Sequence, residues 1–184
     1  MLVAGFMVAG STEIDTNAET VRLLRDQLRL HTPLHVIETD ILQLAQIAAE
    51  QSASTGAADG DGRQEDVRGR PLRSEQDLEA RRHVFANVAF WRQLGIEHQE
   101  PLIVTGTLHF TKRNRGGSLK LTVMFIDGRA GTLISSHIFR QQMPSKRGYL
   151  PALSLYYRLI NPVLPAFLNA VTGQRVRSVR TVLR

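Results

Sequence analysis

The sequence contains no cysteine. Disulfides, thiol catalysis, zinc fingers and iron–sulfur clusters are therefore excluded together, as is a lipid-modified amino-terminal cysteine within this chain. The phosphate-binding pattern G-x-x-x-x-G-K-[ST] and the metal-binding patterns H-x-H and H-E-x-x-H are also missing. The glycines fall where strands are expected to end or turn, so turn chemistry accounts for them. These absences leave organisation and charge as the main guides to function.

Acidic residues are nearly absent from the second half of the chain. Residues 101–184 carry 13 Lys or Arg and one acid, Asp127. Residues 1–50 carry 3 basic and 7 acidic residues, and residues 51–100 carry 7 and 9. The net charges of these stretches, from first to last, are therefore −4, −2 and +12. A surface with this asymmetry attracts an anionic membrane, nucleic acid or an acidic protein.

The composition, 42% hydrophobic and 22% charged, is that of a folded protein. The length favours a single domain over residues 1–184. One stretch differs: residues 52–73 are rich in glycine and mixed charges, which indicates a solvated, disordered loop. At the amino terminus, an apolar run starts at Leu2 with no basic residue before it, so any targeting peptide would precede Met1.

The first forty residues predict a strand–helix–strand unit. An apolar strand is expected over residues 2–9, and Thr16 and Glu19 fit a capping box for a helix that continues to about Leu30. Residues 34–37 then predict a second strand, parallel to the first. A short helix is expected over residues 41–50.

A third helix and three strands are predicted after the loop. The helix begins at Ser74 and ends at Gly95, a typical residue just beyond a helix. The strands span 102–110, 119–126 and 132–140, with turns at 112–117 and at 127–131, where Asp-Gly favours a hairpin. In the last strand, alternation places one group of side chains on one face and another on the opposite face: Leu133, His137 and Phe139 against Ile134 and Ile138.

The most apolar stretch, residues 149–171, predicts helix from Pro151. Pro162 and Pro165 predict a kink or two helices, and Gly173 the end. Arg158 and the prolines argue against a membrane span. A pair of core helices is favoured, with an amphipathic surface segment or an oligomer contact as alternatives. For residues 175–183, the sequence predicts either a last strand or a flexible basic tail.

These elements define the expected fold class. It is an α/β fold of two-layer α+β type, with a mixed sheet of about five strands and helices packed on it. The βαβ start is followed by an antiparallel meander of three strands and a carboxyl-terminal helix.

Two arrangements with possible chemistry are weak. His35, His109 and His137 lie in predicted strands, but ordinary strand histidines explain them better than a metal site. Ser136 and His137 suggest a nucleophile and base, yet adjacent strand residues point to opposite faces. We therefore expect no enzymatic activity, catalytic residue, metal or cofactor.

The basic residues are the best candidates for binding a partner. They form two groups, one in a predicted hairpin and one near the carboxyl terminus: Lys112, Arg113, Arg115, Arg175, Arg177 and Arg180. Nucleic acid is the alternative partner, but base stacking needs aromatic side chains among the cations, and few are placed there. An anionic membrane surface and a homo-oligomer are further possibilities.

Several stretches resemble a family of periplasmic α/β domains found at the amino terminus of TolB and in CsgG and LpoB-type lipoproteins. Residues 3–6 (Val-Ala-Gly-Phe) resemble the family's first strand. Residues 94–97 and 102–107 resemble its helix end running into a strand with a central glycine. Residues 125–131 resemble its hairpin, with Ala130 where the family has threonine. The long loop and basic last third are departures.

The resemblance implies a non-catalytic protein-interaction module. Such modules assemble, scaffold or regulate complexes of the cell envelope. It places the chain in the periplasm or at the outer membrane, with the cytoplasm as the alternative, and its partners among envelope proteins. It carries over no catalytic residue.

Overall fold

The computed structural model describes residues 1–56, 71–113, 116–144 and 150–173. Their centre is one sheet in the order β1-β2-β3-β4. The strands are β1 (Leu2–Gly10), β2 (Leu102–Arg113), β3 (Gly116–Asp127) and β4 (Thr132–Met143). β1 runs parallel to β2, and the other neighbours are antiparallel. The expected fold class, a mixed sheet with helices packed on it and an antiparallel three-strand meander, is confirmed.

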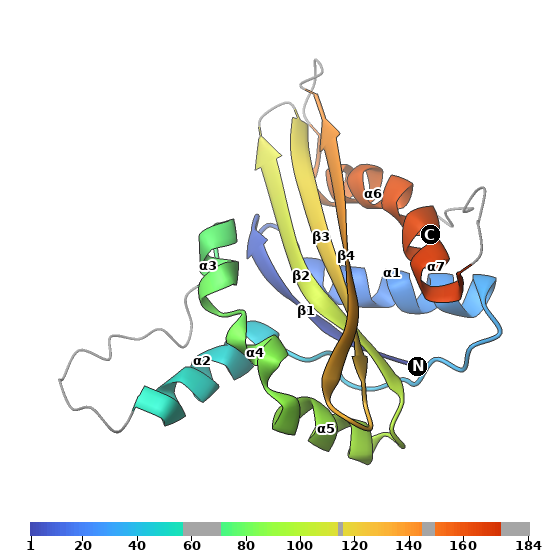
Figure 1. The fold of residues 1–184 in the computed structure, drawn as a ribbon. Helices are drawn as coiled ribbons and strands as arrows, with labels where there is room; N and C mark the ends of the chain where they lie inside the picture. The colour runs from blue at the N-terminus through green and yellow to red at the C-terminus, as the bar shows by residue number, and fades with distance from the viewer. Residues whose placement is uncertain (57–70, 114–115, 145–149, 174–184) are drawn as a thin grey trace.

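Three helices cover one face of the sheet: α1 (Thr16–His31), α6 (Ala152–Ile160) and α7 (Leu164–Thr172). In Figure 1 they lie to the right of the strands. Their apolar side chains pack against those of β1, β2 and β3 in one buried cluster, which includes Phe6, Phe110 and Tyr156. The Tyr156 hydroxyl shares a hydrogen bond of 2.8 Å with the Thr20 hydroxyl, which joins α6 to α1.

The other face is covered by four helices: α2 (Leu44–Gly56), α3 (Glu75–Ala80), α4 (His83–Ala86) and α5 (Val88–Glu97). A second buried cluster lies here, centred on Trp91, which is fully buried and donates its indole N–H to the Val84 carbonyl at 2.9 Å. The prediction of one helix from Ser74 to Gly95 is wrong. Asn87 has a non-helical ψ of 85° and its side chain accepts from the Phe90 N–H, so it starts a new helix.

Residues 34–37 do not form the predicted second strand. Only Ile37 pairs with the sheet, through an isolated parallel bridge to Leu2. The segment that follows is held by α1 instead, because Arg25 donates from Nη2 to the carbonyls of Val3 (2.8 Å) and Thr39 (2.9 Å). The guanidinium of Arg25 thus takes a carbonyl of β1 that a neighbouring strand would otherwise bind. The described sheet therefore has four strands rather than about five.

The start of α1 also differs from the prediction. Its cap is Asp15, whose carboxylate accepts from the Ala18 N–H at 3.0 Å, while Thr16 is already helical. Glu19 does not close a capping box. It accepts a hydrogen bond of 2.5 Å from the Tyr157 hydroxyl, 138 residues away. A second contact thereby joins α1 to α6.

The expected loop at 52–73 is ordered at both ends. The helix predicted over 41–50 starts at Leu44 and continues to Gly56, so the first residues of that loop are helical. At the other end, Leu72 bridges to Ala9 and accepts from the Gly10 N–H. The prediction of disorder for 57–70 falls outside the described residues.

Both hairpins of the meander begin and end close to their predicted positions. β2 extends to Arg113 and β3 begins at Gly116, so most of the turn expected at 112–117 is strand. The hairpin at 127–131 is confirmed: the Asp127 carboxylate accepts from the Arg129 N–H at 2.9 Å, and Gly131 has φ of 73°. A positive φ of this kind favours glycine.

The apolar stretch near the carboxyl terminus divides as expected. α6 ends at Ile160, the 3-10 turn η1 (Asn161–Val163) contains Pro162, and α7 follows. Gly173 ends α7 with φ of 65°. None of the helices in the described ranges has the length and apolar character needed to cross a membrane. The strand or tail expected over 175–183 lies outside these ranges.

Candidate interaction surface

The two edge strands of the sheet, β1 and β4, differ in how far their outer backbone groups are hydrogen-bonded. The outer side of β1 is occupied along its length. The Phe6 N–H donates to the Asn17 side chain at 2.8 Å, and the Ala4 carbonyl accepts from the Leu42 N–H at 2.9 Å. With Arg25 on the Val3 carbonyl, this edge has no room for another strand.

The outer side of β4 is open. β4 pairs with β3, and no hydrogen bond between its outer backbone groups and any other part of the described chain is found. In an antiparallel ladder, every second residue directs its N–H and C=O away from its partner. Figure 1 shows β4 at the front of the sheet, with the labelled helices to either side of it. As far as the described ranges extend, this outer side of β4, the free edge, is therefore a row of unpaired donors and acceptors.

Large apolar side chains accompany this free edge. Leu133, Ile134 and Ile138 are 53%, 60% and 53% exposed. A register shift opposite Phe125 and Ile126 places Leu133 against Ile126. The prediction that Leu133 shares a face with His137 and Phe139 is therefore wrong, because the shift reverses the alternation at this end. Exposed apolar side chains on an unpaired edge mark an interaction site.

A row of basic side chains crosses the sheet at the other end of β4. His109, Lys120 and Arg140 are in register on β2, β3 and β4. Glu75 of α3 lies against two of them, 2.6 Å from Lys120 Nζ and 3.4 Å from His109 Nδ1. The hydrogen bond from Lys120 lowers the pKa of Glu75. Arg140 is exposed and has no ion pair with any described residue.

The residues predicted to bind a partner are only partly described. Lys112 lies 2.6 Å from the Glu13 carboxylate and its side chain is 13% exposed, so its charge is largely compensated. Arg113 is exposed at the end of β2 and, within the described ranges, has no ion pair. The remaining predicted residues fall outside those ranges: Arg115, Arg175, Arg177 and Arg180.

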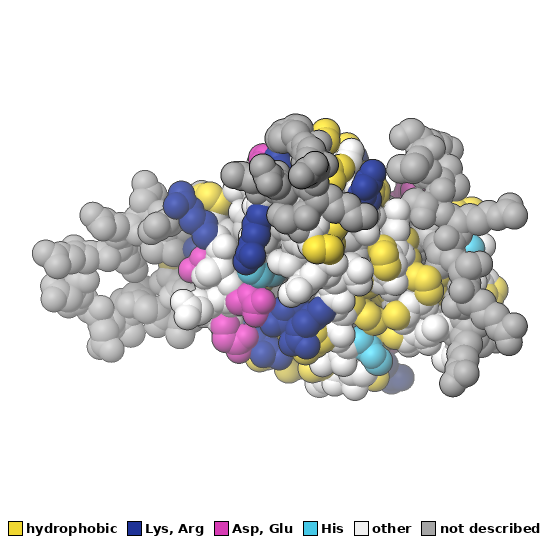
Figure 2. Space-filling model, turned by 90° about the horizontal axis from the view of Figure 1, so that it is seen from above, with side chains coloured by type: hydrophobic (Ala, Val, Ile, Leu, Met, Phe, Trp, Pro, Cys, Tyr) yellow, Lys and Arg dark blue, Asp and Glu magenta, His cyan; other side chains and the backbone are white. Residues whose placement is uncertain are grey.

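Figure 2 looks onto this end of the sheet. It shows Asp and Glu side chains beside Lys and Arg in one part of the surface, and hydrophobic side chains gathered to their right.

Neither arrangement with possible catalytic or metal chemistry comes together. Ser136 is paired with Met124 and His137 with Val123, which belong to different faces, as predicted. The His137 ring packs against Phe125. His109 lies on the opposite face, beside Glu75. No cluster of three or more His, Asp or Glu suited to a metal ion occurs among the described residues.

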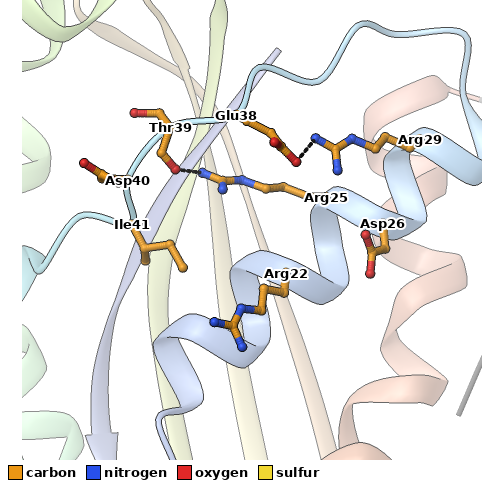
Figure 3. A pocket seen from close by; sticks show the side chains of 8 residues that line it. All are labelled: Arg22, Arg25, Asp26, Arg29, Glu38, Thr39, Asp40 and Ile41. Carbon is orange, nitrogen blue, oxygen red and sulfur yellow. Dashed lines mark hydrogen bonds and ion pairs between the residues drawn. The ribbon is translucent and has the colours of Figure 1, made fainter. Parts of the chain in front are cut away.

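A hollow beside α1 is the other notable feature (Figure 3). Arg25 and Arg29 point to Thr39 and Glu38, while Arg22 lines another part of the hollow. Arg29 and Glu38 form an ion pair of 2.7 Å. Burial lowers the pKa of Arg25. Arg25 and Arg29 thus hold residues 38–39 against α1. Their contacts serve the fold and leave the hollow with no excess of positive charge for a ligand.

The free edge of β4 was not among the sites predicted from the sequence. A signal for it is present: the last strand of a meander lies at an edge by default, and this strand carries apolar residues on both faces and no acid. The predicted binding residues were instead cations in a turn and near the carboxyl terminus.

Comparison with known proteins adds a weak structural likeness. No family model matches the chain, and no curated protein matches it in sequence. Among solved structures, the chain is similar to the LpoB C-terminal domain from Salmonella enterica, with a TM-score of 0.43 and 13% identity over 77% of this chain and 81% of that one. A likeness at this level assigns no function to the chain.

Proposed function

We propose that this chain is a non-catalytic protein-interaction module that assembles, scaffolds or regulates a complex of the cell envelope. The observation that carries the proposal is the free edge of β4, 12 residues long, with Leu133, Ile134 and Ile138 exposed beside it. Natural sheets usually cover or blunt such an edge. The opposite edge of this sheet is covered, so the contrast lies within one molecule.

The energetics favour a partner that uses more than the apolar side chains. Burying three half-exposed Leu or Ile side chains contributes roughly 1 kcal/mol each. Association costs about 4 kcal/mol or more in lost translational and rotational freedom. The apolar contacts alone therefore do not hold a partner, and hydrogen bonds or charge pairs have to supply the rest.

The envelope location rests on the family resemblance of residues 3–6, 94–97, 102–107 and 125–131. Fractionation of the producing cells, with an antibody against the chain, tests it. Recovery with periplasmic or outer-membrane markers supports the location, and recovery with cytoplasmic markers contradicts it.

The interaction itself is tested by capture from an envelope extract with matched variants. Ile134→Lys combined with Ile138→Lys places charge on the free edge, while Leu30→Lys does so at a side chain of α1 that is 62% exposed. We expect the edge variant to lose the captured protein and the α1 variant to retain it. Equal capture by all three proteins contradicts the proposal. DNA or RNA binding whose affinity falls steeply with salt would support the alternative, a nucleic-acid-binding module.

A further inference from the structure

We propose that the partner adds an extended strand to β4, and that this strand is apolar at one end and acidic at the other. The inference rests on the proposed function and specifies its partner. The added strand belongs to a different polypeptide. Its backbone pairs with the free edge, and its side chains determine specificity.

Backbone geometry is the first support. From residue 135 to residue 143, β4 keeps an unbroken register with β3, from the pair Ser135–Phe125 to the pair Met143–Gly117. The register shift is confined to the other end. A regular edge of this length offers outward N–H and C=O groups at every second residue. It accepts a strand of about six to ten residues, the usual length in proteins.

The absence of protective features is the second support. Exposed edges are blunted by proline, by inward-pointing charges, by bulges or by a covering element. β4 contains no proline and no acid, and its one charged residue, Arg140, is exposed. Its bulge is at the end nearest Thr132. Along most of its length, the edge is therefore suited to pairing.

The distribution of side chains gives the partner its chemistry. Leu133, Ile134 and Ile138 lie in the first part of β4, and Arg140 lies in the second. Arg113 lines a hollow with Gln142 and Met143 at that second end. The nearby acids are already paired, Glu75 with Lys120 and Glu13 with Lys112. Within the part of the chain that the structure describes, no carboxylate pairs with Arg140 or Arg113, so we assign their charges to carboxylates of the partner.

A second copy of this chain fits the edge less well. β4 has no acidic residue, so pairing two copies through β4 brings two Arg140 side chains into the interface and no carboxylate to meet them. Like charges directly opposite each other are destabilising, and in any other register neither Arg140 meets a carboxylate of β4. An acidic strand from another protein satisfies both the backbone and the charge.

Selection from a random display library tests the proposal. The probe is a pool of unstructured peptides of about ten residues, panned against the immobilised full chain. We expect enriched sequences with alternating apolar residues in one half and Asp or Glu in the other. No enrichment, or enrichment of basic or uncharged sequences, overturns the proposal.

Two variants then locate the bound peptide. Arg140→Glu is expected to lower the affinity for an enriched acidic peptide by about fivefold, because it replaces an exposed ion pair with a pair of like charges. Arg158→Glu, at an exposed arginine of α6, is the matched control and is expected to have no effect. Equal weakening by both variants indicates a general charge effect and overturns the placement on β4.

Backbone methylation tests strand addition directly. One synthetic peptide carries N-methyl groups on one set of alternate residues, and a second carries them on the other set. Only one set faces β4, so one peptide is expected to bind and the other to fail. Binding by both, or dimerisation of the chain through β4, overturns the proposal. If peptides fail while the Ile134→Lys, Ile138→Lys variant still loses its captured protein, the proposed function stands and strand addition falls.

Discussion

Gly95 sits at a backbone contact that positions the start of β4, and its replacement by alanine is a sharp test of the structure. Gly95 lies inside α5 rather than beyond it. A Cβ at this position would lie 1.8 Å from the Gly128 carbonyl oxygen and 2.4 Å from its carbonyl carbon. Real contacts of this kind exceed 3 Å, and both obstructing atoms are backbone. The helix and the hairpin must therefore separate.

Two effects of Gly95→Ala oppose each other. Alanine is favoured over glycine within a helix by about 1 kcal/mol. Overpacking costs about 1–3 kcal/mol, and the upper end applies because no flexible side chain can move aside. We expect a net loss of about 2 kcal/mol in the free energy of unfolding, which corresponds to a fall of roughly 4–8 °C in Tm for a chain of this size.

Urea unfolding followed by tryptophan fluorescence measures this loss. Trp91 is the single tryptophan and is fully buried one turn before Gly95, so its emission reports on this region. Ile96→Ala, at a neighbouring side chain that is 54% exposed, is the control. It is expected to change stability by about 0.5 kcal/mol or less. A Gly95→Ala protein as stable as the wild type, or more stable, refutes the packing of α5 on the hairpin.

Further predictions concern contacts that are distant in sequence. Tyr157→Phe removes the hydrogen bond to Glu19 and is expected to cost about 1–2 kcal/mol in urea unfolding. Burial, with Glu19 adding to it, raises the pKa of Tyr157 to about 12, so the favoured neutral hydroxyl contributes stability below pH 10 that is lost as the pH rises through about 12. In a tyrosinate absorbance titration, the wild type should show a late step that Tyr157→Phe lacks. Identical curves for the two proteins contradict the raised pKa of Tyr157. Arg25→Met leaves the carbonyls of Val3 and Thr39 without their donor and is expected to cost about 2–3 kcal/mol and to open residues 37–42 to proteolysis. The pKa of Glu75 is lowered by Lys120, so its contribution is present near neutral pH and is lost as the pH falls through the folded-state pKa; Glu75→Gln is expected to flatten this small acid-side change in Tm, and an unchanged acid profile contradicts the ion pair.

Local patterns in the sequence predicted the sheet well. The apolar run after Met1, the alternation after Leu119 and the Asp127 turn each depend on neighbours within a few residues, and the structure confirms all three. The break near Pro162 is of the same kind, since a missing N–H interrupts a helix wherever it occurs.

The errors arose where distant residues decide the outcome. Residues 34–37 have the composition of a strand, but Arg25 takes the carbonyl that a ladder would have used. Glu19 fits a capping box, yet Tyr157 binds it from 138 residues away. Gly95 fits a helix end, but Gly128 requires a glycine opposite it. No local pattern contains these partners.

The candidate site was predicted least well, for a related reason. Cations can be counted in a sequence, but their ion pairs cannot, and Lys112 is compensated by Glu13. Whether an edge strand is open depends on what the rest of the chain places over it. That contrast, a covered β1 and an open β4, exists only in the folded molecule.

Amide hydrogen exchange along β4, in the free chain and with an enriched acidic peptide bound, shows whether this edge is open and whether a strand pairs with it. In the free chain, we expect alternate amides between residues 135 and 143 to exchange rapidly while those paired with β3 are protected. Peptide binding should slow the rapid set by about tenfold or more and leave β1 unchanged. Uniform protection of β4 before binding, or no change on binding, would contradict the account.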